Sequence, residues 1–249
     1  MSGSSVAAVV DDETWVVDLT VRGTWERQLW LRTFGLINEC LAHHPAGLLL
    51  DLRGLHDPGA ISAPLWVTAA TTGDRMDPPV RIAACPPPGT DLATRLDGHT
   101  ARRLVPAFAT VPLARSFLAS RRPMLDRVRL HLPPTNGAAA GARHVVTLAC
   151  EEWGMHPHLA RARLVVSELV LNAAEHAGTP IDVLISRRGR GTWLHLAVID
   201  GSTEPPRMRP EPVEVFGERG YGLRIVDAAV HTWGALPTRT GKMVWALIG

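Results

Sequence analysis

A glutamate and an asparagine four residues apart form the first pair in this sequence that could do chemistry. They are Glu168 and Asn172. On a helix this spacing places both side chains on one face. A carboxylate there can take a proton from a substrate hydroxyl, and an amide oxygen can ligate a hard cation such as Mg²⁺. Taken alone, the pair fits the solvated face of an ordinary amphipathic helix equally well, and that simpler interpretation is favoured.

An acid at the end of an apolar run is the second feature. Asp200 follows Val198 and Ile199, and Gly201 comes next. A carboxylate at a strand end can accept a hydrogen bond from an exocyclic amine such as that of adenine. Asp-Gly is also a common turn pair, so this signal is weak by itself.

The third feature is a glycine-rich segment between positions 217 and 222, which leads into a helical pattern. Glycines let backbone amides approach phosphate oxygens, and a helix N-terminus adds a favourable partial charge. The segment lacks the lysine pattern of a P-loop, and the strand before it is not in the Rossmann position. A glycine-rich loop alone is again weak evidence.

The elements that must position these residues follow from the hydrophobic periodicity of the second half. The pattern predicts strands at 128–132, 181–187, 193–200 and 242–247, with helices at 139–152, 158–176 and 222–230. A proline-rich loop at 202–212 is too long for a simple connection, which favours a lid or a mobile segment.

The first half alternates strands and helices. Strands are predicted at 15–21, 47–52, 80–84 and 108–111, and helices at 25–42, 64–72, 91–105 and 113–120, with Thr24 as an N-cap. This alternation predicts a mixed or parallel sheet with helices against it. The pattern restarts near Arg122, so we expect two α/β domains, residues 1–122 and 123–249.

Composition narrows the class of protein. The chain has 249 residues with 46% hydrophobic and 20% charged residues and a net charge of +2, which is typical of a globular protein and does not call for a nucleic-acid partner. The three cysteines lie far apart, as expected in a reducing cytoplasm. No apolar run reaches the roughly 18 residues of a membrane helix, so we expect a soluble, cytoplasmic protein.

The order and spacing of the three features resemble the N, G1 and G2 boxes of the GHKL ATPase superfamily, most closely its anti-sigma-factor serine kinase branch. The resemblance covers residues 127–249 and includes Gly220-Tyr221-Gly222 and the ending Gly241-Lys242. It implies a GHKL (Bergerat) α/β sandwich for the C-terminal domain, with ATP and Mg²⁺ as cofactors.

The resemblance also implies a role for each residue of the three boxes. Glu168 would be the base that acts on a substrate hydroxyl, and Asn172 would ligate the Mg²⁺ that bridges the ATP phosphates. The remaining residues would bind the nucleotide: Asp200 with Gly201 at the adenine, Gly220 and Gly222 beside the phosphate-covering loop, and Arg219 at the γ-phosphate or a partner.

Two departures from the family pattern weaken this expectation. Many members have Asp-x-Gly-x-Gly in the G1 box, whereas Asp200 is followed here by Gly201, Ser202, Thr203 and Glu204. Met243 stands where many members carry a threonine near adenine, and Thr240 is the candidate to replace that hydroxyl. A catalytically inactive domain therefore stays open.

The N-terminal half resembles a STAS domain, the fold of anti-sigma-factor antagonists, through Asp51-Leu52-Arg53-Gly54 and the order of its elements. Pro58 occupies the position of the usual phosphoacceptor serine. Ser62 could be a displaced acceptor, but a helix cap before Pro64 is the preferred interpretation. We therefore expect a docking or self-regulating module.

Three functions follow from these resemblances. The leading hypothesis is an anti-sigma factor with serine/threonine protein kinase activity that acts by partner switching, with a sigma factor or a STAS-domain antagonist as partner. The alternative is an inactive ATP-fold binding module regulated in cis by the STAS-like half. A sensor histidine kinase is disfavoured because no long helix with a phosphoacceptor histidine precedes the ATP domain.

A homodimer and a cis arrangement of the two halves both stay open.

Overall fold

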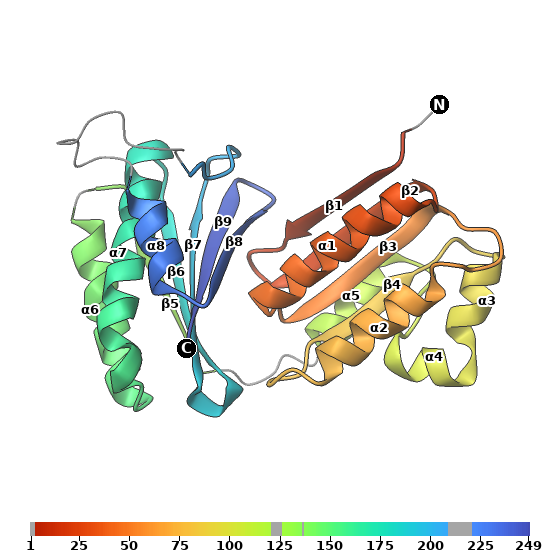
Figure 1. Ribbon diagram of the computed structural model, residues 1–249, viewed down its shortest axis with the longest axis horizontal. Coiled ribbons are helices and arrows are strands. Elements are labelled where there is room, and N and C mark those ends of the chain that lie inside the picture. The colour runs from red at the N-terminus through yellow and green to blue at the C-terminus, as the bar shows by residue number, and fades with distance from the viewer. Residues whose placement is uncertain (1–2, 121–125, 136, 209–220) are drawn as a thin grey trace. The chain divides into compact units, whose positions relative to one another are not determined.

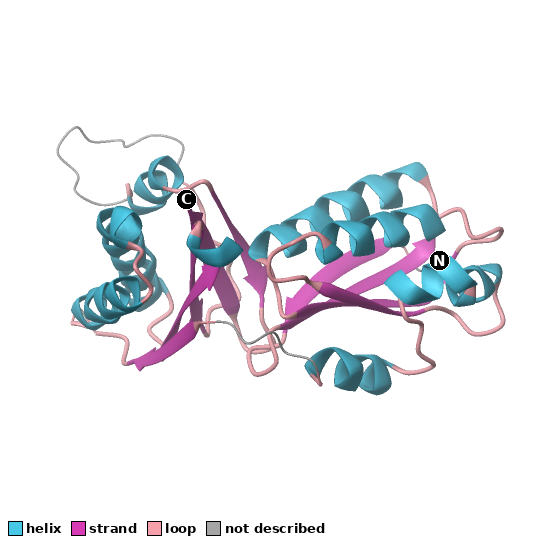
Figure 2. Ribbon diagram, turned by 90° about the horizontal axis from the view of Figure 1, so that it is seen from below, coloured by secondary structure: helices cyan, strands magenta, loops and turns pink. Residues whose placement is uncertain are grey.

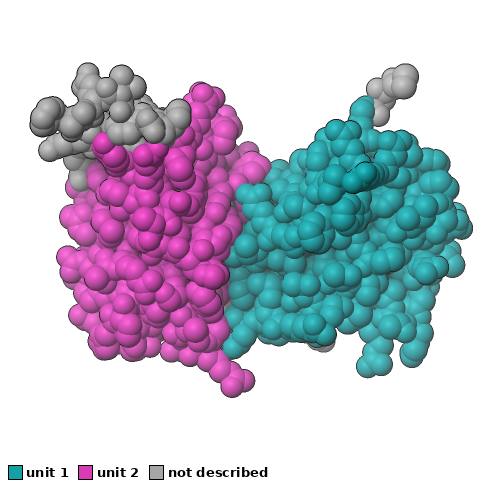
Figure 3. All heavy atoms as spheres, viewed as in Figure 1, with its two compact units in different colours: residues 1–124 teal, residues 125–249 magenta. Residues whose placement is uncertain are grey.

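A computed structural model describes residues 3–120, 126–135, 137–208 and 221–249. The chain divides into two compact units, Met1–Met124 and Leu125–Gly249, which Figure 3 distinguishes by colour. Each unit contains its own sheet and its own helices. In the described residues no helix is long and apolar enough to cross a membrane.

The first unit is built on a four-stranded sheet in the order β1-β2-β3-β4. Its strands are β1 (Ser5–Val10), β2 (Val16–Thr24), β3 (Gly47–His56) and β4 (Arg81–Cys85). The β1–β2 pair is antiparallel, and the β2–β3 and β3–β4 pairs are parallel. This confirms the predicted mixed sheet, to which β1 adds an edge strand that the sequence pattern had not indicated.

The helices of this unit cover both faces of the sheet (Figures 1 and 2). They are α1 (Arg27–His43), α2 (Ala63–Asp74), α3 (Asp91–Asp97), α4 (His99–Leu104) and α5 (Val111–Ala119). Leu49 packs with Ala114 and Leu118 of α5, and strand alternation turns Leu48 and Leu50 to the opposite face. A strand buried on both faces explains the continuous apolar run of β3.

Three local predictions in this unit were wrong. The segment 108–111 forms no strand: Ala107 makes a single bridge to Ala84, and α5 already begins at Val111. The helix expected over 91–105 is two short helices, because Gly98 takes a non-helical conformation between them. Thr24 ends β2 and caps no helix.

The start of α2 is held by Asp57. Its carboxylate accepts hydrogen bonds from the backbone N–H of Ile61 at 3.0 Å and of Ser62 at 2.9 Å, and from the Ser62 hydroxyl at 2.6 Å. Ser62 Oγ in turn accepts the indole N–H of Trp66 at 2.8 Å. Ser62 occupies the N-cap position, as expected, but its side chain makes no capping bond because Asp57 takes that role.

The second unit has a five-stranded sheet in the order β5-β6-β7-β9-β8, in which every neighbouring pair is antiparallel. Its strands are β5 (Arg127–Leu132), β6 (Ile181–Arg188), β7 (Trp193–Asp200), β8 (Thr232–Pro237) and β9 (Lys242–Ile248). The strand β8 was not expected from the sequence. It lies at the sheet edge, where Gly234 and Pro237 weaken the strand pattern.

Three helices cover one face of this sheet (Figure 1): α6 (Ala138–Glu152), α7 (Leu159–His176) and α8 (Gly222–Ala229). Short 3-10 turns at His156–His158 and Gly189–Gly191 complete the unit. Buried residues of α6 and α7, such as Val146 and Val165, form one core with Val183, Leu196 and Ala246 of the sheet. A sheet with helices on one face confirms the predicted α/β sandwich of the GHKL type.

Candidate functional site

The helix α7 fixes the position of the acid and amide pair. Val165, Leu169 and Ala173 are buried in the core of the second unit, so the opposite side of the helix is left for polar groups. Glu168 and Asn172 are each only partly buried. Their i, i+4 spacing places them on adjacent turns, as the sequence predicted. Leu164, on the same helix, is 43% exposed, so the apolar face of α7 does not include it.

The first residue of α8 lies directly against this pair. A Cβ added to Gly222 would be 2.9 Å from Glu168 Oε2, 3.3 Å from Asn172 Nδ2 and 3.4 Å from Asn172 Oδ1. Glycine is therefore the residue that allows this close approach. The fold brings together Glu168, Asn172 and Gly222, three of the residues that the sequence singled out, although Gly222 lies 50 positions after Asn172 in the chain.

The amide of Asn172 has unused hydrogen-bonding capacity. Its Nδ2 atom is buried, and no described residue accepts a hydrogen bond from it. A buried polar group without a partner is costly, and such groups mark sites that a ligand completes. The described residues contain no cluster of three His, Cys, Asp or Glu side chains that could hold a metal ion. One amide ligand together with phosphate oxygens and water is, however, a coordination that suits Mg²⁺.

The electrostatic surroundings of Glu168 suit a base. Burial raises the pKa of the Glu168 carboxyl, and the negative charge of Glu175 adds to the effect. A carboxylate with a raised pKa binds a proton more strongly than an ordinary surface glutamate. The group therefore moves toward the range in which general bases operate.

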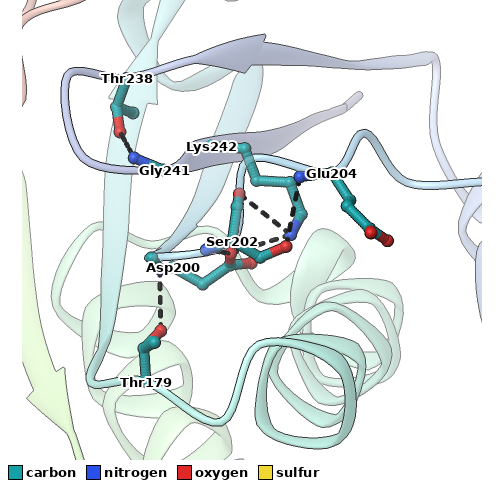
Figure 4. Close-up of polar contacts among 8 residues, drawn as sticks. Thr179, Asp200, Ser202, Glu204, Thr238, Gly241 and Lys242 are labelled. Atoms are coloured by element: carbon teal, nitrogen blue, oxygen red, sulfur yellow. Dashed lines mark hydrogen bonds and ion pairs between the residues drawn. The ribbon is translucent and has the colours of Figure 1, made fainter.

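Asp200 is held at the end of β7 by a lysine from the neighbouring strand (Figure 4). The Lys242 ammonium donates to Asp200 Oδ1 at 2.8 Å, and the backbone N–H of Ser202 donates to the same oxygen at 2.8 Å. The Lys242 Nζ atom also lies 3.5 Å from the carbonyl oxygen of Ser202. The side chain of Asp200 is 2% exposed and that of Lys242 is 11% exposed. This is a buried ion pair.

Two threonines complete the surroundings of Asp200. The Thr179 hydroxyl accepts the backbone N–H of Gly201 at 2.8 Å, which ties the segment after α7 to the end of β7. Thr238 accepts the N–H of Gly241 at 3.0 Å, and a Cβ on Gly241 would overlap the backbone carbonyl of Asp200. The turn between β8 and β9 therefore packs closely against the strand end (Figure 4).

Thr240, another predicted residue, is exposed in the turn between β8 and β9. Met243 is buried and pairs with Ile199 across the two strands. Arg219 and Gly220 lie outside the described residues, as does the part of the proline-rich loop from 209 to 212.

The sequence interpretation overlooked Lys242 and Thr179 as neighbours of Asp200. One signal was available for Lys242: of 26 lysine and arginine residues in the chain, it is the only lysine. No local pattern indicates Thr179, because its partner Gly201 lies 22 positions further along the chain.

The fold of the second unit, an antiparallel sheet with helices on one face, is of the GHKL type. Residues 132–247 match the family described as the histidine kinase-like ATPase domain. The second unit therefore contains a histidine kinase-like ATPase domain, a kind of domain that implies ATP as its ligand. No curated protein compared with the chain matches it.

Among solved structures, 16 chains match. One is an anti-sigma factor antagonist from Mycobacterium paratuberculosis, with 16% identity, a TM-score of 0.37 and coverage of 46% of this chain and 94% of that chain. Another holds the RsbU and RsbW domains of a Mycobacterium tuberculosis protein, with 23% identity, a TM-score of 0.36 and coverage of 51% of this chain and 33% of that chain.

Proposed function

We propose that the protein is an ATP-dependent serine/threonine protein kinase that regulates transcription as an anti-sigma factor by partner switching. The observation that carries the proposal is the meeting of Glu168, Asn172 and Gly222 in a histidine kinase-like ATPase domain. The substrate would be a STAS-domain antagonist, and the sequestered partner a sigma factor. The N-terminal unit, with its STAS-like motif, would serve as a docking or self-regulating module.

Each site residue has a distinct task in this proposal. Asn172 would hold Mg²⁺ through its amide oxygen, and Asp200 would accept the amine of adenine, while the N-terminus of α8 at Gly222 would face the phosphates. Arg219 and Gly220 keep their proposed roles beside the phosphates. Mg-ATP, when bound, would supply the phosphoryl group, and its Mg²⁺ would neutralise the developing charge.

Glu168 would take the proton from the substrate hydroxyl. Its raised pKa strengthens it as a base, and the helix α7 holds it one turn from the residue that would position the metal. Most of the rate enhancement would come from positioning, because phosphoryl transfer needs little covalent help from the protein.

The first test is titration calorimetry of ATP with and without Mg²⁺. Wild-type protein should bind ATP, and Asn172→Ala should lose the Mg²⁺-dependent part of the affinity. Asn38→Ala makes the same chemical change at an exposed position of α1 and should bind as wild type does. Transfer of labelled γ-phosphate to a purified STAS-domain protein then tests the kinase activity. Binding without transfer to any such protein would contradict the catalytic part of the proposal.

A non-catalytic binding module is the second candidate. The observation that favours it is the occupied acceptor at Asp200, whose Oδ1 already receives two hydrogen bonds from within the chain. The missing glycines at Ser202 and Glu204 point the same way. Absence of ATP binding by the wild-type protein, with its fold intact, would favour this candidate.

A further inference from the structure

The only lysine of the chain is paired with the acid to which the proposed function assigns adenine binding. We propose that Lys242 is a second base-reading residue of that site, which offers an N–H donor beside the Asp200 acceptor so that the two residues together read the amine and the adjacent ring nitrogen N1 of adenine. This inference rests on the proposed function and deepens it, since it names the base and the residue that selects it.

The hydrogen bonds of Asp200 leave one oxygen for a ligand. Oδ1 receives the Lys242 ammonium and the Ser202 N–H, both at 2.8 Å, which uses its two acceptor positions. Among the described residues no donor is bonded to Oδ2. Oδ2 is therefore the oxygen that can accept a hydrogen bond from the amine of a ligand.

The ammonium of Lys242 has an N–H donor that is not used within the described part of the protein. It carries three N–H donors. One is directed to Asp200 Oδ1, and a second has the Ser202 carbonyl oxygen at 3.5 Å as its acceptor (Figure 4). The described residues give the third donor no acceptor. An available donor thus lies next to an available acceptor, at the end of β7.

This pairing of donor and acceptor selects among the purines. Adenine presents an amine donor beside the acceptor N1, so each of its groups finds one partner. Guanine presents two donors, N1–H and the 2-amine, beside its carbonyl oxygen. With Oδ1 already saturated, the two guanine donors would have to share the single oxygen Oδ2, which is less favourable than one partner for each group. The site therefore favours ATP over GTP.

The presence of lysine rather than arginine at position 242 supports the proposed role in base recognition. An arginine opposite a carboxylate forms two parallel bonds and occupies both oxygens, whereas an ammonium acts at a point. Arginine at position 242 would thus use Oδ2 and close the acceptor to adenine. Among the 26 lysine and arginine residues of the chain, the only lysine is the one that pairs with Asp200.

A purine series tests the inference by calorimetry. The ligands are Mg-ATP and 1-deaza-ATP, in which a C–H replaces the N1 acceptor. Loss of one hydrogen bond should weaken 1-deaza-ATP about tenfold relative to ATP on the wild-type protein. On Lys242→Met the two ligands should bind alike. The variant Arg239→Ala, which removes a cation from the neighbouring turn, should keep the wild-type ratio.

A charge-conserving variant separates base reading from simple structural support. Lys242→Arg retains the ion pair and the positive charge, so a purely structural lysine would be replaced without loss. We expect Lys242→Arg instead to weaken ATP about tenfold or more while its melting temperature stays near that of the wild type.

A spectroscopic readout uses the wild-type chain alone and guards against a Lys242→Met variant that fails to fold. Because the protein has one lysine, labelling with ¹³C,¹⁵N-lysine gives a single Cε–Nζ correlation. ATP should shift this signal, and saturating 1-deaza-ATP should shift it much less. Equal shifts, or an unchanged ratio of affinities in Lys242→Met, would overturn the inference while the proposed ATP binding stands. No binding of ATP by the wild type would overturn both.

Discussion

Glu168 combines a chemical role with an energetic cost at the scale of the single residue. Burial and Glu175 raise its pKa in the folded state above the ordinary value of a glutamate, so the folded protein holds its proton more tightly than the unfolded chain does. Stability from this group is therefore greatest at low pH and is lost as the pH rises through the raised folded pKa. At neutral pH the ionised carboxylate opposes folding slightly.

The proposed role of Glu168 as base and its raised pKa give two expectations for Glu168→Gln. Phosphotransfer should fall by about 10²–10⁴-fold because the base is lost, while the melting temperature at neutral pH should rise or stay unchanged. For the wild type, activity should decline as the pH falls through the raised pKa of Glu168, at a higher pH than for an ordinary glutamate. A pH profile of the initial rate measures the effect on activity, and a thermal melt measures the effect on stability. Glu152→Gln, at the exposed end of α6, is the control.

Gly222 leaves little space for a side chain beside α7. In Gly222→Ala the new methyl group would lie 2.9 Å from Glu168 Oε2, so the carboxylate or α8 must move. We expect ATP affinity to fall about tenfold or more, since the movement would displace a hydrogen bond between the protein and the nucleotide, worth roughly 1–1.5 kcal/mol. The measurement is calorimetry with Mg-ATP. Gly35→Ala is the matched control, because a Cβ there meets nothing within 4 Å, and unchanged affinity in both variants would contradict the assigned phosphate site.

At the scale of the element, Asp57 decides how α2 begins. It accepts three hydrogen bonds from Ile61 and Ser62, and it is 7% exposed. Ser62 is fully buried between Asp57 and Trp66. A phosphate on Ser62 would place a second negative charge against the buried Asp57, so the observed geometry disfavours Ser62 as an acceptor.

We expect Asp57→Ala to destabilise the first unit by about 2–4 kcal/mol, because it removes a helix cap and leaves buried donors unsatisfied. Chemical denaturation, followed by tryptophan fluorescence, would measure the change. Asp91→Ala removes one exposed bond to the Gly59 N–H and serves as the control, with an expected loss below about 1 kcal/mol. A loss in Asp57→Ala no larger than in the control would show that the cap contributes little.

At the scale of the whole molecule, the two units have separate cores and separate sheets. Such units unfold as distinct cooperative blocks, and a ligand stabilises only the block that binds it. We expect saturating Mg-ATP at about 100 times its Kd to add about 2.7 kcal/mol to the second unit alone.

Differential scanning calorimetry with and without Mg-ATP measures this effect. The transition that Asp57→Ala lowers should be insensitive to ATP, and the other transition should rise with ATP concentration. A uniform upward shift of both transitions would mean that nucleotide binding stabilises the chain as one block.

The sequence by itself determined most of the helices and the central strands, because these are long and strongly periodic. The helix α7 and the strand β7 carry their apolar pattern within one local segment, and the order of the three boxes pointed to the GHKL class before any contact was known. The edge strands β1 and β8 were missed, although each pairs with the next strand along the chain. Within the site, the i, i+4 spacing of Glu168 and Asn172 was readable for the same local reason.

Only the tertiary structure decided which groups surround these residues. Lys242 meets Asp200 because β9 pairs with β7, and Gly222 meets Glu168 because α8 packs on α7. Likewise, Asp57 rather than Ser62 caps α2, since the loop folds its carboxylate back onto two N–H groups. Local periodicity records how a segment buries its own apolar face, whereas the partner of a polar group depends on how segments far apart in the chain close on one another.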